Sequence, residues 1–72
     1  MRLREILASN LRQLRDLKGL SQESLADLAE IDRSYISYLE NQRYSASLDM
    51  LEKLAIALGV EPQELITARP SM

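Results

Sequence analysis

The chain has 72 residues, a net charge of −2 and neither cysteine nor histidine. Its length suits one domain with a small core, which no disulfide or thiolate-bound metal can reinforce. Histidine is the commonest general base and metal ligand in proteins. Because the chain has none, we expect no enzyme activity, no metal site and no cofactor.

The charges are unevenly distributed along the chain. Residues 1–20 carry a net charge of +3, residues 21–49 carry −4 and residues 50–72 carry −1. No apolar run is long enough to span a bilayer, and the first residues lead into no signal-peptide core. We therefore expect a cytoplasmic protein that does not associate with membranes. Most of the charges are expected to solvate the surface, and the net charge of −2 predicts only modest non-specific affinity for DNA.

The first expected helix runs from about Leu3 to Lys18. Its apolar residues recur at helical spacing and would form one buried stripe: Leu3, Leu7, Leu11 and Leu14. Gly19 follows at the position where a glycine commonly ends a helix.

Two short helices with a tight connection are expected between Gly19 and Glu40. Ser21 can cap the first of them, whose buried stripe would be Leu25, Ala26 and Ala29. Asp32 can cap the second, in which Ile36 and Leu39 are the apolar positions. The side chains left to point outward from the second helix are Arg33, Ser34, Ser37 and Tyr38. Small hydrogen-bonding side chains on a helix held by a shorter one are typical of a helix-turn-helix, which indicates DNA binding.

Two further helices are expected in the C-terminal third. Ser47 can cap a fourth helix with the apolar positions Leu48, Leu51, Leu54, Ala55 and Leu58. Gly59 closes that helix, and Pro62 suits the first turn of a short fifth helix that carries Leu65 and Ile66. We expect a single domain over residues 1–66 and a flexible tail over residues 67–72.

Several motifs match a known pattern at their mutual spacings. The matching residues are Leu14-Arg15, Gly19-Leu20-Ser21-Gln22, Leu25-Ala26, Arg33-Ser34-Tyr35-Ile36-Ser37, Leu39-Glu40-Asn41, Ser47-Leu48, Leu51, Lys53-Leu54-Ala55 and Ala57-Leu58-Gly59-Val60. In these residues the chain resembles the Cro and lambda-repressor type of helix-turn-helix, the XRE family, from about Leu7 to Ile66. The resemblance implies an all-α, compact, five-helix lambda-repressor-like domain whose helix-turn-helix is formed by the second and third helices.

The resemblance also implies which side chains meet the bases. By position they are Arg33, Ser34, Ser37 and Tyr38. Arg33 can donate two hydrogen bonds to guanine O6 and N7, whereas the serines specify weakly. Two plainer interpretations stay open: Arg33 can be a solvated arginine paired to Glu30, and Tyr38 can be an aromatic residue at the edge of the core.

Phosphate contacts are implied on either side of these base readers. The residues that match are Gln22, Asn41, Gln42, Arg43 and Tyr35. Gln22 would be assisted by the positive end of a helix dipole; the alternative is an ordinary exposed glutamine. We expect Tyr35 to be partly buried with its hydroxyl free to reach the DNA backbone.

Arg15 and Glu40 match positions that form a partly buried ion pair in the family, and we expect them to be structural residues. The chain departs from the family pattern in two connections. Glu30 stands where the turn of the motif usually has glycine, and Gln42 stands where a glycine is common after the third helix. A non-glycine residue in a left-handed conformation costs about 1 kcal/mol, so we expect the turn at Glu30 to be strained or differently shaped. The change at Gln42 weakens the case for phosphate contacts from that loop.

A possible dimer face lies on the last two helices. Its apolar residues are Met50, Ile56, Leu65 and Ile66. An exposed apolar patch usually marks a partner surface, which here would be a second copy of the chain, although the same residues can instead cover the core of a small monomer. Leu17 and Leu28 are also apolar where family members are often polar, and they can pack against each other.

The function expected from these features is that of a sequence-specific DNA-binding transcriptional regulator. It would bind double-stranded DNA at a near-palindromic operator, as a homodimer and through the major groove, with no small-molecule ligand. Its size resembles that of phage repressors and of the controller proteins of restriction-modification systems. The alternative is a protein-interaction module, or an antitoxin, that uses the same scaffold to hold a partner on its apolar face.

Overall fold

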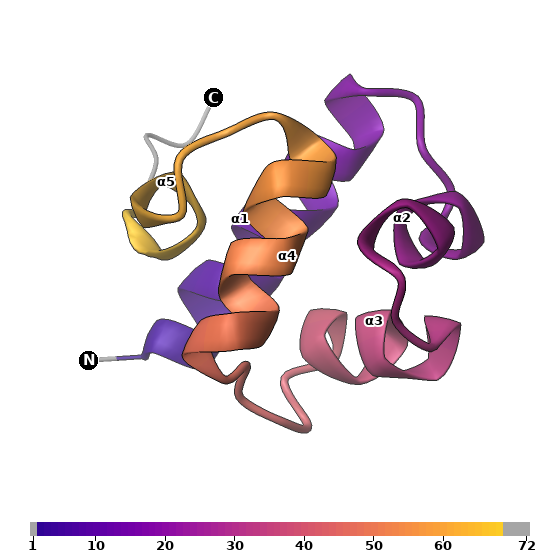
Figure 1. Ribbon diagram of the computed structural model, residues 1–72. Helices are drawn as coiled ribbons and strands as arrows, with labels where there is room; N and C mark the ends of the chain where they lie inside the picture. The colour runs from indigo at the N-terminus through magenta and orange to yellow at the C-terminus, as the bar shows by residue number, and fades with distance from the viewer. Residues whose placement is uncertain (1, 69–72) are drawn as a thin grey trace.

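The computed structural model describes residues 2–68, which form five helices: α1 (Leu3–Leu17), α2 (Gln22–Ala29), α3 (Arg33–Glu40), α4 (Leu48–Leu58) and α5 (Gln63–Ile66). No strand occurs within that range, so the predicted all-α fold is confirmed. In Figure 1, α1 and α4 occupy the middle of the molecule, with α5 on one side and the α2–α3 pair on the other. The predicted tail lies mostly outside the described residues.

The predicted helix starts are confirmed by their capping hydrogen bonds. The Ser21 hydroxyl accepts from the backbone N–H of Ser24 at 3.0 Å, and the Ser47 hydroxyl accepts from that of Met50 at 3.1 Å. The Asp32 carboxylate accepts from the N–H of Ser34 at 2.9 Å. Each cap satisfies an N–H that has no partner inside its own helix, which fixes where α2, α4 and α3 begin.

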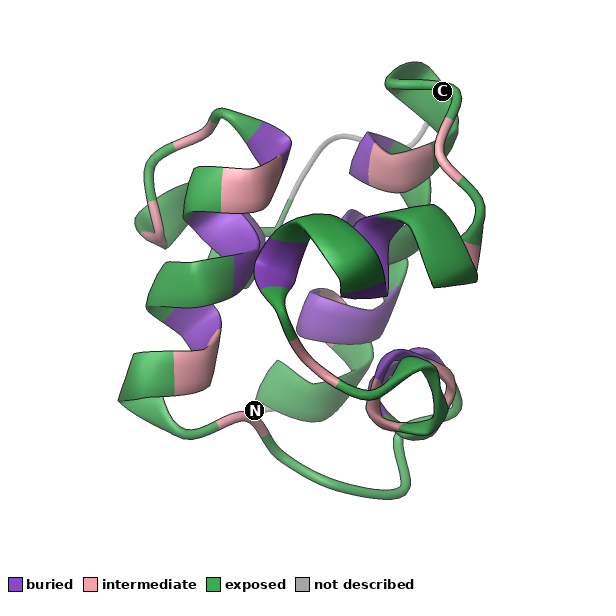
Figure 2. Ribbon diagram, turned by 45° about the vertical axis from the view of Figure 1, so that its right-hand side comes forward, coloured by how far each residue is buried: buried purple, intermediate pink, exposed green. Residues whose placement is uncertain are grey.

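The core receives side chains from all five helices. Its largest fully buried apolar members are Leu11, Leu25, Ile36, Leu39, Leu54, Leu58 and Leu65. Figure 2 shows buried segments alternating with exposed ones along the helices, as expected where each helix packs by one face. The helices in closest contact are the pairs α1·α5, α2·α3, α1·α3 and α2·α4.

Two residues of the predicted stripes lie outside this core. Leu48 is 84% exposed and Leu3 is 47% exposed, so their assignment to the buried stripes was wrong. Each is the first residue of its helix, and the other helices do not cover that terminal turn. Helical spacing identifies a face of the helix, but it does not show how far along the helix the partner reaches.

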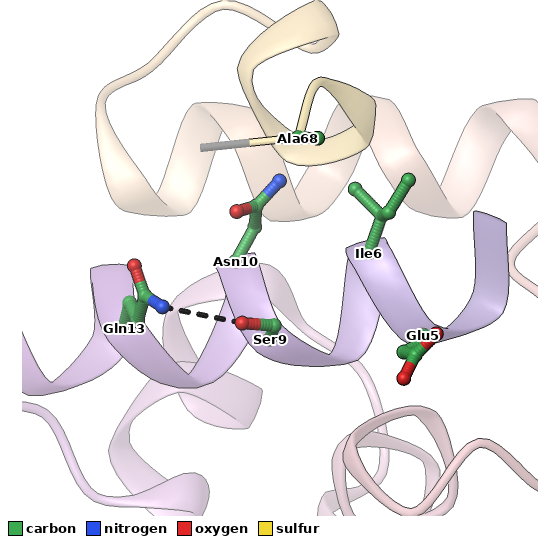
Figure 3. A pocket seen from close by; sticks show the side chains of 6 residues that line it. All are labelled: Glu5, Ile6, Ser9, Asn10, Gln13 and Ala68. Atoms are coloured by element: carbon green, nitrogen blue, oxygen red, sulfur yellow. Dashed lines mark hydrogen bonds between the residues drawn. The ribbon is translucent and has the colours of Figure 1, made fainter. Parts of the chain in front are cut away.

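Asn10 was missed by the sequence analysis and is almost completely buried. Its side-chain amide nitrogen donates to the carbonyl oxygens of Glu64, Leu65 and Thr67 at 3.2, 3.0 and 2.9 Å. Figure 3 shows the Asn10 side chain rising from α1 toward the segment that contains Ala68, at one wall of a small pocket. Asn10 therefore joins α1 to the carbonyl groups at the end of α5, which have no N–H donor within their own helix. The signal for this role was available: Asn10 stands three residues after Leu7 and four before Leu14, on the apolar stripe.

Candidate nucleic-acid interface

The connection between α2 and α3 is a tight turn centred on Glu30. This residue has φ 59° and ψ 45°, a left-handed conformation that favours glycine. The turn is closed by the N–H of Ile31, which donates to the carbonyl of Ala26 at 2.9 Å. The chain thus keeps the backbone geometry of the turn without the usual glycine, and the same holds at Gln42, whose φ is 61°.

The face of α3 opposite the core carries the predicted base readers. Ile36 and Leu39 point into the core, whereas Arg33, Ser34 and Tyr38 are exposed and Ser37 is half-buried. Within residues 2–68 no ion pair joins Arg33 to Glu30, so that pairing is not observed, and the exposed arginine fits both a base reader and a solvated first-turn residue. Arg33 therefore stands in the first turn of α3 with its guanidinium directed to solvent.

The serines of α3 are partly engaged with their neighbours. The Ser34 hydroxyl donates to the Asp32 carboxylate at 2.9 Å, while the Ser37 hydroxyl accepts from the Asn41 amide at 3.3 Å. The pKa of Asp32 is lowered, mainly because the backbone N–H and hydroxyl of Ser34 donate to its carboxylate, with a smaller contribution from the charge of Arg33. Ser34 thus serves the capping of α3 in addition to any contact with DNA.

A buried carboxylate joins the three N-terminal helices. Arg15 Nε and Nη2 donate to the two carboxylate oxygens of Glu40 at 2.8 and 3.2 Å, and Arg15 Nη1 donates to the Leu20 carbonyl at 2.8 Å. The structure therefore contains the ion pair that the family resemblance implied. The pKa of Arg15 is raised, chiefly by its hydrogen bond to Glu40. The pair fixes the end of α3 relative to α1.

Gln22 and Arg12 extend this network. Gln22 Nε2 donates to Glu40 Oε1 at 3.1 Å, and Arg12 Nη2 donates to the Glu40 carbonyl oxygen at 3.2 Å. The interpretation of Gln22 as an ordinary exposed glutamine is therefore wrong, because its side chain is half-buried and bonded. One amide N–H of Gln22 remains for another acceptor, since the amide nitrogen has two donors.

The connection between α3 and α4 holds the other predicted phosphate contacts. Asn41 Nδ2 donates back to the Ser37 carbonyl at 2.9 Å, so its amide is partly committed to α3. Gln42 and Arg43 are exposed, and no side-chain hydrogen bond to another described residue holds either of them. The Tyr35 hydroxyl donates to the Ser45 carbonyl at 3.3 Å, so the expectation of a free hydroxyl was wrong. Tyr35 faces the loop because the loop folds back along α3.

The residues predicted for a dimer face differ in how far they are exposed. Ile56 is 75% exposed and Ile66 is also exposed, whereas Met50 is half-buried against the core. Leu65 has no exposed surface, so its assignment to an interface was wrong. The short α5 packs on α1, and Leu65 is the side chain by which it enters the core.

Two helices of eight residues each, joined by a tight turn and leaving one face of the second exposed, define a helix-turn-helix protein. The chain belongs to the Helix-turn-helix family (HTH_3, the XRE type) of transcriptional regulators, whose family model matches residues 11–65. In the part of the chain that the structure describes, no helix is long and apolar enough to cross a membrane.

Comparison with known proteins gives three informative matches. A hypothetical transcription factor of Neisseria meningitidis is 45% identical over 64 residues, covering 89% of this chain, which spans 60% of the length of that relative. The controller protein C.AhdI from Aeromonas hydrophila has a structure with a TM-score of 0.83 and 47% identity, covering 86% of this chain and 94% of that one. The controller protein C.Esp1396I, seen as a tetramer with its 35 base-pair operator, has a TM-score of 0.79 and 25% identity, covering 93% and 99% of the two chains.

Proposed function

We propose that this protein is a cytoplasmic, sequence-specific regulator that binds a near-palindromic DNA operator as a homodimer, with α3 in the major groove. The observation that carries the proposal is the exposed face of α3, where Arg33 is unpaired within residues 2–68 and Tyr38 is also exposed. A helix of this kind, held by a preceding helix, is the element that helix-turn-helix proteins insert into the groove.

Arg33 would provide most of the base discrimination. Its guanidinium can donate two parallel hydrogen bonds to guanine O6 and N7, a pair that contributes about 1–3 kcal/mol against the wrong base. Ser34 and Ser37 can both donate and accept, so they would add little specificity. Tyr38 offers a ring to a thymine methyl group.

Phosphate contacts would come from few residues, because the chain is acidic overall. Gln42 and Arg43 are the strongest candidates, since both are exposed and follow the end of α3. Gln22 begins α2 and retains one amide N–H beside the N-terminal backbone groups of that helix. Asn41 and Tyr35 would need to exchange or share their present hydrogen bonds.

A dimer would place two copies of α3 on successive turns of the major groove, about 34 Å apart. After Leu65 is removed from the predicted face, the exposed apolar residues that support self-association are Ile56 and Ile66, with Met50 at the edge of the core. A controller protein of similar fold, C.Esp1396I, is known as a tetramer in complex with its operator, which supports an assembly of this kind here.

A binding selection with randomised duplex DNA tests the proposal. Wild type should recover a palindrome, Arg33→Ala should lose one guanine preference in each half-site, and Arg33→Lys should lose the same preference. Lysine is the matched control because it keeps the charge but cannot form the bidentate pair. If the folded wild-type protein recovers no motif, the operator function is excluded.

A protein-interaction function is a second candidate because two large apolar residues, one at the end of α1 and one in α2, are exposed. Leu17 and Leu28 are both exposed, so neither packing of one against the other nor packing against the N-terminal segment covers them. Exposed leucines on α1 and α2 suit a partner surface separate from α3. Double substitution of Leu17 and Leu28 by serine should leave DNA selection intact if the operator function is the correct one.

A further inference from the structure

Tyr44, in the loop between α3 and α4, packs against both tyrosines of the recognition helix. Its ring centroid lies 5.0 Å from that of Tyr38 at an interplanar angle of 75°, and 6.4 Å from that of Tyr35 at 69°. Both contacts are edge-to-face, the arrangement that the ring quadrupoles favour. The chain has only these three tyrosines and no other aromatic residue, so all of its aromatic side chains meet at this one place.

The loop is fixed to α3 on each side of Tyr44. The N–H of Arg43 donates to the Tyr38 carbonyl at 2.8 Å, and the Tyr35 hydroxyl donates to the Ser45 carbonyl at 3.3 Å. Tyr44 is therefore held between two residues whose backbones are bonded to the helix. Its backbone has little freedom, and its ring has a defined position against α3.

Tyr38, in contrast, depends on this contact. Its side chain is 38% exposed, and no hydrogen bond to another described residue orients its hydroxyl. An exposed aromatic side chain without neighbours samples more than one rotamer, and fixing it on binding costs conformational entropy. The ring of Tyr44 is the aromatic neighbour that restricts Tyr38 before any ligand arrives.

We propose that Tyr44 is a positioning residue for DNA recognition: its ring holds the ring of Tyr38 in one orientation on the exposed face of α3. This inference rests on the proposed function, because it assigns Tyr38 to the DNA. Tyr44 acts through Tyr38 and is not itself a base reader. Preorganisation of this kind improves affinity by removing an ordering cost from the binding step.

The test compares Tyr44→Leu with Tyr44→Phe in the same randomised-duplex selection. Tyr44→Leu should bind the selected operator roughly two- to tenfold more weakly and lose the base preference that Tyr38→Ala loses. Tyr44→Phe keeps the ring and should retain both affinity and preference. The double variant Tyr38→Ala/Tyr44→Leu should bind no worse than Tyr38→Ala alone, because a positioning residue has no effect without the side chain that it positions.

A measurement on the free protein tests the contact between Tyr44 and Tyr38 independently of DNA binding. In the free protein, Tyr44→Leu should shift the ring-proton resonances of Tyr38, whereas Tyr44→Phe should shift them little. Thermal unfolding of each variant shows that it is folded, as expected for a residue that is 55% exposed.

Three results would overturn the inference. Unchanged Tyr38 resonances in Tyr44→Leu would show that Tyr44 does not position the ring. A loss of affinity that adds to that of Tyr38→Ala would make Tyr44 a direct DNA contact. A wild type that selects a motif, with Tyr44→Leu selecting the same motif at equal affinity, would remove the inference alone, whereas a wild type that selects no motif would remove the proposed function with it.

Discussion

Arg15 and Glu40 form a two-point ion pair that connects the later part of α1 to the last residue of α3, with nitrogen–oxygen distances of 2.8 and 3.2 Å. Glu40 also accepts from Gln22, so one carboxylate holds α1, the first residue of α2 and the end of α3 together. The orientation of α3 is consequently set by a buried polar group in addition to the apolar core. Such a pair contributes little in net terms, but the loss of one member leaves a buried charge without a partner.

Removal of that carboxylate should destabilise the fold. We expect Glu40→Ala to lower the free energy of unfolding by about 3–5 kcal/mol, because Arg15 and Gln22 lose their common acceptor. Urea denaturation followed by circular dichroism measures this loss. The double variant Arg15→Met/Glu40→Leu is the control and should be more stable than Glu40→Ala, since it leaves no buried charge without a partner. An unfolding curve like that of wild type, with only DNA affinity reduced, would contradict the structural role.

Asn10 should control the docking of α5. In Asn10→Asp the amide donor is replaced by a carboxylate that faces the carbonyl oxygens of Glu64, Leu65 and Thr67. The charged form is disfavoured there, so the variant should be less stable than wild type by about 1–3 kcal/mol at neutral pH. Hydrogen exchange should show faster opening of the α5 amides in this variant. Substitution of the exposed neighbour Ser9 by alanine is the matched control and should leave α5 protected.

Two residues with a left-handed backbone conformation allow substitutions that should change the free energy of unfolding in opposite directions. Glu30→Gly should raise the free energy of unfolding by about 0.5–1 kcal/mol, because glycine adopts a φ near 59° without strain. Gly59→Ala should lower it by about 1 kcal/mol for the same reason, since Gly59 has φ 70° and an added Cβ would meet only Lys18 Nζ, at 4.0 Å. Thermal denaturation of both variants checks the prediction. A destabilised Glu30→Gly variant would show that the glutamate side chain stabilises the turn.

The cap of α3 should give part of the acid sensitivity of the protein. The pKa of Asp32 is lower in the folded state than its ordinary value, because the N–H and hydroxyl of Ser34 donate to the carboxylate. Its contribution to stability is therefore complete above the unfolded-state pKa, near 3.9, and is lost as the pH falls through the lower folded-state value. Asp32→Asn keeps a capping oxygen but does not titrate. The free energy of unfolding of Asp32→Asn should fall less than that of wild type between about pH 6 and about pH 3. An equal decrease in the two proteins would exclude a contribution from Asp32.

The sequence by itself determined the five helices and the starts of three of them, α2, α3 and α4. Ser21, Asp32 and Ser47 each cap a backbone N–H two or three residues ahead, and the glycines Gly19 and Gly59 adopt the left-handed geometry expected at helix ends. These features depend on residues within one helical turn of each other, so they can be inferred without knowledge of the fold. The exposed reading face of α3 followed from the same periodicity, once Ile36 and Leu39 were assigned to the core.

Only the tertiary structure decided which side chains are covered and what they meet. Leu65 is in the core and Leu48 is exposed, although both stand at regular apolar positions, because burial depends on where distant helices end. Asn10 meets carbonyl groups more than fifty residues away, and Gln22 meets Glu40 across the motif. The contact between Tyr44 and Tyr38 likewise exists because the loop folds back along α3. Local propensity determines where the helices form. Which side chains meet across the chain depends on how the helices pack, and this cannot be inferred from a short stretch of sequence.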